Sequence, residues 1–300
     1  MSVTALGLIL IAALAHASWN LLSKQASAAA GTLYIWLVAA VAAVAYAPVV
    51  AGSVLLQHPH LTAMNWLFMA GTGVLEAAYF QFLQAGYRLG DLSVVYPVGR
   101  GTGALLAALA GITLLAERPG PAGIAGIVAI VAGITLIGLP AGGRPAAPRA
   151  AAAPGRARPR LAAAVALALA TGTFIASYTL WDKYAVATLG TPAVLQGYAT
   201  FPVMLAAFAP YALRRRAQLA AVWRSYRPQV IGTGLLTPLA YMLVLAALSF
   251  TAVSAVAPVR EVSVLFGVVL GRRVLGEGGM ARKLVAAAAI VAGIISIAFG

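Results

Sequence analysis

The sequence predicts an all-α polytopic membrane protein, with ten transmembrane helices arranged as two inverted five-helix repeats around a central cavity. The first observation is composition: 62% of the 300 residues are hydrophobic and 9% are charged, against roughly 45–50% and about 25% in soluble domains. The second is that the apolar runs have the length of about 20 residues that a helix needs to cross a bilayer. The third is an internal duplication. Because lipid offers backbone groups no hydrogen-bond partner, the runs are expected to be helices.

The apolar runs are separated by glycines, prolines and clusters of charge, which mark the expected helix ends. In the first half the runs lie at 3–24, 31–52, 64–86, 92–115 and 121–139. In the second half they lie at 161–186, 191–213, 229–248, 252–271 and 281–299. Between the halves, residues 140–160 are rich in Ala, Pro, Gly and Arg without an apolar period. The chain is therefore expected to contain a first repeat (1–139), a flexible linker (140–160) and a second repeat (161–300).

Short phrases recur in the same order in both halves. Ala17-Ser-Trp-Asn-Leu-Leu-Ser-Lys24 matches Ala176-Ser-Tyr-Thr-Leu-Trp-Asp-Lys183, and Ser93-Val-Val-Tyr-Pro97-Val matches Ser254-Ala-Val-Ala-Pro258-Val. Glu117 is matched by Glu277. Such order indicates a duplication. With five spans per copy, the second copy is expected to be inverted in the membrane, as in transporters that alternate access.

Charge predicts the orientation in the membrane and excludes several functions. Lys and Arg gather in the loops after odd-numbered runs and in the linker, which places the linker in the cytoplasm and both termini outside, in a bacterial inner membrane. The formal net charge of +14 therefore indicates topology and contact with anionic lipid, and not nucleic-acid binding. We expect no enzyme activity, metal or cofactor: the chain has no cysteine, no phosphate-binding Gly-Lys-Ser/Thr sequence and no GxSxG motif.

Ionisable residues inside the runs are the strongest functional signal, because a charge at membrane depth costs a few kcal/mol, about 2.5–3.5 on insertion scales. Glu76 lies in the third run and is a candidate proton carrier or a core hydrogen-bonding group. Arg100 follows Pro97, and Arg260 and Glu261 follow Pro258. Proline opens a helix, so two broken helices are expected to meet at one site. The alignment leaves open whether Arg100 corresponds to Arg260 or Glu261.

Two interpretations of these charges remain. Either they form interior salt bridges, or one arginine is left to bind a carboxylate or phosphate with its planar fork. Arg260 and Glu261 are adjacent, so they are expected to diverge by about 100° around a helix and not to face one cavity. Glu76 or Glu261 is the expected proton-coupling group, with His16 as a further candidate.

Aromatic and polar side chains near these charges are candidate substrate contacts. Trp19 and Tyr178 occupy matching positions in the two copies and are expected to flank the pathway. The remaining candidates, on the first, third and eighth runs, are Asn20, Tyr79 and Tyr241. Lys24, Lys183 and Asp182 lie close to run ends and are expected at the membrane interface.

Three motifs together resemble the EamA-like branch of the drug/metabolite transporter superfamily. They are His16-Ala-Ser-Trp-Asn, Gly90-Asp-Leu-Ser-Val-Val-Tyr-Pro97 and Ala116-Glu117-Arg118, in this order along a chain of 300 residues. The resemblance implies a proton-coupled or exchanging carrier, usually an exporter, of amino acids, sugars, nucleosides or related metabolites. It also implies a central cavity lined by both repeats.

The sequence thus favours a secondary active transporter of a small amphipathic metabolite. Its expected partners are that metabolite, the lipid bilayer and either protons or an exchanged metabolite, and the chain is expected to act as a monomer or a homodimer. The alternative is a flippase or other protein that handles lipids or lipid-linked substrates. A cavity enclosed between the repeats favours the metabolite, whereas a lateral gap towards lipid near the arginines favours the lipid. A third possibility, a scaffold, requires that all buried charges are paired with one another.

Overall fold

The protein is helical throughout the residues that the structure, a computed structural model, describes: 1–89, 92–138, 157–263, 266 and 280–299. The helices are α1 (Val3–Gln57), α2 (Ala63–Leu89), α3 (Leu92–Leu114), α4 (Pro121–Gly138), α5 (Ala157–Ala187), α6 (Ala193–Leu213), α7 (Arg216–Phe250), α8 (Val253–Arg260) and α10 (Met280–Phe299). The predicted all-α class is confirmed. Glu277 and residues 140–156 of the predicted linker lie outside the described residues.

Two of these helices contain a kink with an identifiable cause. α1 contains the first two predicted runs and bends at Gly31, where φ is +49° and ψ is −128°, a conformation that only glycine adopts without steric cost. α7 begins at Arg216, before its predicted start, and bends at Tyr226. Pro228 follows this bend, and a proline ring clashes with the carbonyl four residues before it. The predicted eighth run therefore matches the part of α7 that follows the bend.

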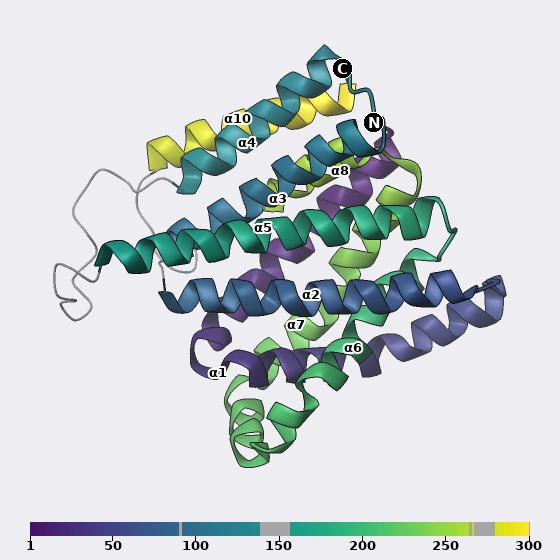
Figure 1. The fold of residues 1–300 in the computed structure, drawn as a ribbon, viewed down its shortest axis with the longest axis vertical. Helices are drawn as coiled ribbons and strands as arrows, with labels where there is room; N and C mark the ends of the chain where they lie inside the picture. The colour runs from purple at the N-terminus through teal and green to yellow at the C-terminus, as the bar shows by residue number, and fades with distance from the viewer. Residues whose placement is uncertain (90–91, 139–156, 264–265, 267–279, 300) are drawn as a thin grey trace.

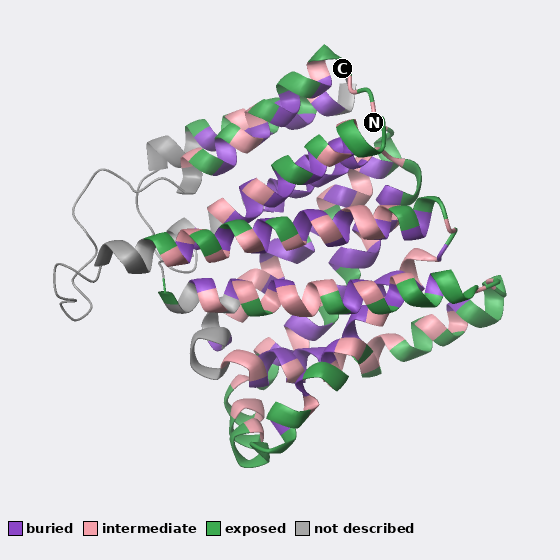
Figure 2. Cartoon of the chain, in the orientation of Figure 1, coloured by how far each residue is buried: buried purple, intermediate pink, exposed green. Residues whose placement is uncertain are grey.

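Within the described part of the chain, five helical segments are long and apolar enough to cross a membrane. They are Val3–Ser23, Gly31–Gln57, Ala162–Ala187, Ala193–Leu213 and Arg216–Phe250. Large apolar side chains such as Leu14, Val44, Val128 and Ile295 are exposed, and exposed residues follow the outer helix faces in Figure 2. An apolar exterior over long apolar helices indicates a protein embedded in a membrane.

The two halves of the chain pack against each other along most of their length. α1 packs on α7, α2 on α5 and α6, α3 on α5 and α8, and α4 on α10. One hydrophobic core draws residues from both halves, among them Ile9, Ile130, Ile175, Leu245 and Ile290. Both chain ends lie on one side of the molecule in Figure 1, whereas α4 ends and α5 begins on the opposite side.

α4 and α10 pack closely at two facing glycines. A Cβ on Gly126 would lie 2.6 Å from the Gly293 carbonyl oxygen, and a Cβ on Gly293 would lie 2.6 Å from the Gly126 carbonyl oxygen. The contact is reciprocal beyond the glycines too, because Gly126 faces Ile297 and Gly293 faces Ile130. Further along, Gly133 faces Ile290 and Ala286, so the helices run antiparallel.

Gly126→Ala is expected to destabilise the protein, because the new methyl group meets backbone that cannot move aside cheaply; overpacking typically costs about 1–3 kcal/mol. The measurement is the thermal unfolding midpoint in detergent. Gly52→Ala is the matched control, since a Cβ at Gly52 meets nothing within 4 Å. Equal midpoints for the two variants would contradict the close packing of α4 on α10.

Candidate functional site

The short helix α8 is held at its first residues by a side chain from the other half of the chain. Glu117, in the connection between α3 and α4, accepts the backbone N–H of Val253 at 2.7 Å on Oε1 and that of Ser254 at 2.8 Å on Oε2. A carboxylate suits this position because the first N–H groups of a helix have no partner within the helix and carry partial positive charge. The carboxylate thereby fixes the start of the helix that carries Arg260.

Lys183 fixes the end of α7 nearby. Its Nζ donates to the carbonyl oxygens of Leu248, at 2.8 Å, and Thr251, at 2.9 Å. Lys183 is partly buried, and its position at the membrane interface stays a prediction. The carbonyls at the end of a helix favour a cation. Two cavities, of about 400 and 310 Å³, lie beside Glu117, and Lys183 lines the larger one.

The proline-containing helices differ from the expectation that both are broken. α3 continues through Pro97 and ends at Leu114, whereas α8 ends at Arg260, two residues after Pro258. Pro97 and Pro258 are each the sixth residue of their helix. Because the two prolines have the same position, proline alone does not decide where these helices end.

Arg260 and Glu261 converge, contrary to the expected divergence. α8 ends between them, and Glu261 has φ −72° and ψ −1°. Because the helical spacing no longer applies at this point, the side chains meet, with 3.4 Å between Arg260 Nε and Glu261 Oε1. Both are buried, with 2% of Arg260 and none of Glu261 exposed.

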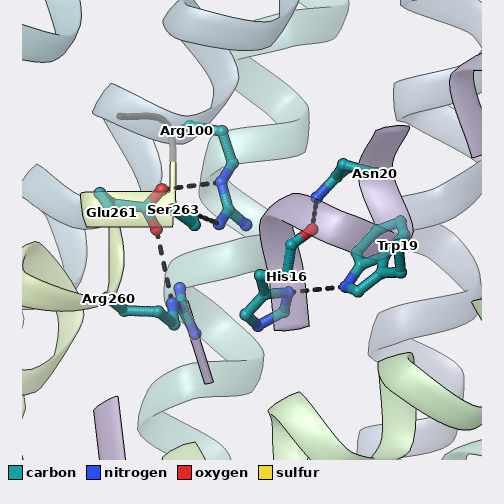
Figure 3. Close-up of polar contacts among 7 residues, drawn as sticks. All are labelled: His16, Trp19, Asn20, Arg100, Arg260, Glu261 and Ser263. Carbon is teal, nitrogen blue, oxygen red and sulfur yellow. Dashed lines mark hydrogen bonds and ion pairs between the residues drawn. The ribbon is translucent and has the colours of Figure 1, made fainter. Parts of the chain in front are cut away.

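Arg100 completes this group from α3. Its Nε lies 2.8 Å from Glu261 Oε2, and an Nη donates to Ser263 Oγ at 3.4 Å (Figure 3). Glu261 therefore forms ion pairs with an arginine from each half of the chain. Arg260 keeps a buried Nη2 without a hydrogen-bond partner, so the charge of Glu261 does not satisfy both guanidinium groups.

His16 on α1 lies near both arginines. Its Nδ1 accepts the indole N–H of Trp19 at 2.8 Å, and Asn20 Nδ2 donates to the His16 carbonyl oxygen at 2.7 Å. With Nδ1 acting as acceptor, the proton of a neutral ring is on Nε2. This buried Nε2 also has no hydrogen-bond partner. We call His16, Arg100, Arg260 and Glu261 the arginine cluster. It offers two buried donors without partners inside the helical bundle.

A second polar group, which we call the Asp182 cluster, joins four helices. Asp182 on α5 is fully buried, which corrects its expected position at the interface. Its carboxylate accepts hydrogen bonds from the hydroxyls of Thr72 and Tyr241 and from Gln196 Nε2, the last at 2.9 Å. The sequence interpretation missed Asp182 because α5 continues past it to Ala187 while α2, α6 and α7 cover it.

Glu76 lies one helical turn after Thr72, beside Thr200 and Tyr241. Thr200 lies one turn after Gln196 on α6. Its side chain is buried, and its hydroxyl oxygen has no partner within hydrogen-bond distance and angle. Thr72 and Gln196 are themselves in contact, with 2.7 Å between the Thr72 hydroxyl oxygen and Gln196 Nε2. Thr72 and Glu76 on α2 are four residues apart, as are Gln196 and Thr200 on α6. This spacing puts the two polar side chains on one face of each helix, and it was the sequence signal available for this contact.

Three tyrosines line the region between α2 and α7. Tyr178 lies edge-on to Tyr79, with ring centroids 5.9 Å apart, and edge-on to Tyr241, with centroids 6.0 Å apart. All three are buried. Of the candidate aromatic residues, Tyr79, Tyr178 and Tyr241 are thus brought together, while Trp19 contacts the arginine cluster through His16.

Comparisons with known proteins show the fold alone. No family model matches the chain, and neither does any curated protein. A solved structure, described only as "Crystal structure of protein", is similar with a TM-score of 0.73 and 17% sequence identity. The similarity covers 99% of this chain and 98% of that one, so the whole helical arrangement occurs in a second protein.

Proposed function

We propose that the protein is a secondary active transporter, an exporter or exchanger, of a small amphipathic metabolite that carries an anionic group. The observation that carries this proposal is the pair of buried unpartnered donors, Arg260 Nη2 and His16 Nε2. A buried donor without an acceptor costs roughly 1–3 kcal/mol. A carboxylate or phosphate bound between them would satisfy both, and Arg260 offers the planar geometry that such groups favour.

The body of the metabolite would contact aromatic side chains. Tyr79, Tyr178 and Tyr241 supply buried ring surface, and Trp19 lies beside His16. Arg100 is a less suitable anion ligand than Arg260, because it already interacts with Glu261 and Ser263. We therefore assign the anionic group of the substrate to Arg260.

Alternating access would occur between two inverted five-helix repeats with ten spans. The reciprocal antiparallel contact of Gly126 with Gly293 supports this, because a two-fold axis in the membrane plane produces such contacts. The equal position of Pro97 in α3 and Pro258 in α8 also supports it. We place the protein in a bacterial inner membrane with both termini outside, on the distribution of Lys and Arg, and within the EamA-like branch that its motifs resemble.

Glu76 is the proposed proton carrier. In and beside the two clusters, the described residues include three carboxylates and two guanidinium groups. Asp182, Glu261, Arg100 and Arg260 are buried, and Glu76 is partly buried beside the Asp182 cluster. Glu261 pairs with both arginines, and Asp182 accepts three hydrogen bonds. Glu76 is the carboxylate left for a proton.

Glu76→Gln is expected to keep substrate binding and to abolish the effect of a pH gradient on transport, because glutamine mimics a permanently protonated glutamate. The measurement is uptake into liposomes with and without a pH gradient. Unchanged pH dependence in this variant would remove Glu76 from the coupling mechanism.

The burial of the arginines favours a metabolite over a lipid. Only 6% of Arg100 and 2% of Arg260 are exposed, whereas a lipid headgroup would need an arginine that opens laterally to the bilayer. A scaffold in which all buried charges satisfy one another is also disfavoured, since Arg260 Nη2 and His16 Nε2 have no partners.

The proposal is tested with purified protein in liposomes against a panel of labelled amino acids, sugar phosphates, nucleotides and neutral nucleosides. Saturable exchange of an anionic compound is expected, and the matching neutral compound, such as the nucleoside without its phosphate, should be exchanged at least about tenfold more slowly. Scrambling of a labelled anionic phospholipid, with no exchange of any soluble compound, would favour the lipid alternative.

A further inference from the structure

Asp182 forms no ion pair with any described side chain. Within the described part of the chain, no Lys, Arg or His lies within ion-pair distance of Asp182, and the ion pairs of the arginines go to Glu261. An unpaired ion buried in a protein costs several kcal/mol. A counter-charge is therefore needed at this point, and it has to come either from a proton or from a bound cation.

The hydrogen bonds of Asp182 favour its charged form, which a bound cation would balance. Oδ1 accepts from Thr72 and Gln196, and Oδ2 accepts from Tyr241. Donors aimed at both oxygens stabilise the charged form of a carboxylate. A proton on Oδ1 would require one of its two donors to turn away, whereas Oδ2, with one donor, keeps a lone pair that a proton or a cation can bind.

An unpartnered oxygen marks the same place independently. Gln196 is fully buried, and its Oε1 has no hydrogen-bond partner. Its orientation is fixed, because Nε2 donates to Asp182 Oδ1, to the Phe68 carbonyl at 3.2 Å and to Thr72. Oε1 is therefore a buried acceptor on the same amide group that binds Asp182.

We propose that the Asp182 cluster binds a monovalent alkali-metal cation, with Asp182, Thr72, Gln196 and Tyr241 as oxygen ligands. Carboxylate, amide and hydroxyl oxygens are the ligands of hard cations. A monovalent ion fits a site with one carboxylate in contact; among the described residues, no group of three or more His, Cys, Asp or Glu side chains is placed to hold a metal ion. The four ligands come from α2 in the first half of the chain and from α5, α6 and α7 in the second half.

The cation site gives the transporter a way to move an anion without net charge. An anion at Arg260 and a cation at Asp182 would bind as a neutral pair. This use of the site rests on the proposed function, but the binding of the cation does not, so the two are tested separately.

The test measures cation binding to purified protein in nanodiscs without substrate. The protein is first equilibrated in choline chloride and then titrated with ²²Na⁺, and in a second arm with NaCl or KCl while the thermal unfolding midpoint is followed. One saturable site per chain and a raised midpoint are expected, and the two salts distinguish sodium from potassium. Absence of saturable binding of both ions would overturn the proposal and leave the anion carrier unaffected.

Variants assign the site within the molecule. Asp182→Asn should abolish binding, and Tyr241→Phe should weaken it about tenfold, the effect of about 1.4 kcal/mol. Tyr198→Phe is the matched control on α6, because its hydroxyl donates to the Ala43 carbonyl at 3.0 Å and not to Asp182; Glu117→Gln is the carboxylate control. If Asp182→Asn does not fold, the comparison of Tyr241→Phe with Tyr198→Phe decides. Equal cation affinity in those two variants, or unchanged binding in a folded Asp182→Asn protein, would overturn the proposal.

Discussion

Arg260→Ala is expected to reduce the exchange of the anionic substrate by roughly 10- to 150-fold. The estimate corresponds to the loss of a charge-assisted hydrogen bond of about 1.5–3 kcal/mol. The fold should persist, because Glu261 keeps its 2.8 Å ion pair with Arg100 when Arg260 is removed. Arg260→Lys should retain part of the activity, since lysine keeps the charge but lacks the planar fork. The measurement is the initial rate of exchange in liposomes, with the affinity determined separately by titration calorimetry.

Arg227→Ala is the matched control for this prediction. Arg227 is an exposed arginine on α7, and its guanidinium lies 5.7 Å from the centre of the Trp223 ring. Its removal also lowers the net charge by one but leaves the arginine cluster intact. Equal losses in the two variants would show that total charge controls the exchange rate, and an unchanged rate in Arg260→Ala would exclude Arg260 as the anion ligand.

Glu261→Ala is expected to destabilise the protein more than any other single change considered. It leaves Arg100 and Arg260 buried beside each other with no carboxylate between them, and breaking a buried ion pair typically costs about 3–5 kcal/mol. The measurement is the free energy of unfolding in detergent, or the thermal unfolding midpoint where unfolding is irreversible. Expression in the membrane should fall in parallel.

The double variant Arg100→Leu/Glu261→Leu separates the contribution of ion pairing to stability from that of packing. Replacing a buried pair with apolar residues is often neutral or even stabilising, so the double variant should be more stable than Glu261→Ala although it loses two polar groups. A double variant less stable than Glu261→Ala would show that these side chains act through shape and not through ion pairing.

The helix positions were predictable because lipid imposes one simple rule. A chain in hydrocarbon has to satisfy its own backbone hydrogen bonds, so apolar runs became helices with nearly the predicted ends: α3 begins at Leu92 and ends at Leu114, and α4 begins at Pro121. The errors have local causes. α7 begins 13 residues before its predicted start because an exposed helical segment with arginines precedes the kink at Tyr226.

The arginine cluster was partly predictable, because charged residues at membrane depth are rare enough to be noticed singly. Arg100, Arg260 and Glu261 were candidates, and they do meet. Their partnership was not predictable, since the expectation of divergence assumed a continuous helix and α8 ends at Arg260. Which arginine keeps an unpartnered nitrogen depends on distances of 2.8 and 3.4 Å to one carboxylate.

The burial of Asp182 could not be predicted from its position in the sequence. Asp182 lies near the end of an apolar run, where a charged residue is usually interfacial, and its three hydrogen-bond donors are separated from it by 14 to 110 positions in the sequence. Only the packing of α2, α6 and α7 around α5 buries it.

The sequence by itself therefore determined the class of the protein and the positions of most helices. It also identified the charged residues that lie within apolar runs. These properties depend on solvent transfer and hydrogen bonding, which act on each segment separately. The tertiary structure alone decided which charges balance one another, that Arg260 Nη2 and His16 Nε2 keep no partner, and that Asp182 is buried. Those properties depend on contacts between helices from both halves, because the strength of an electrostatic interaction is set by distance and local dielectric and not by position along the chain.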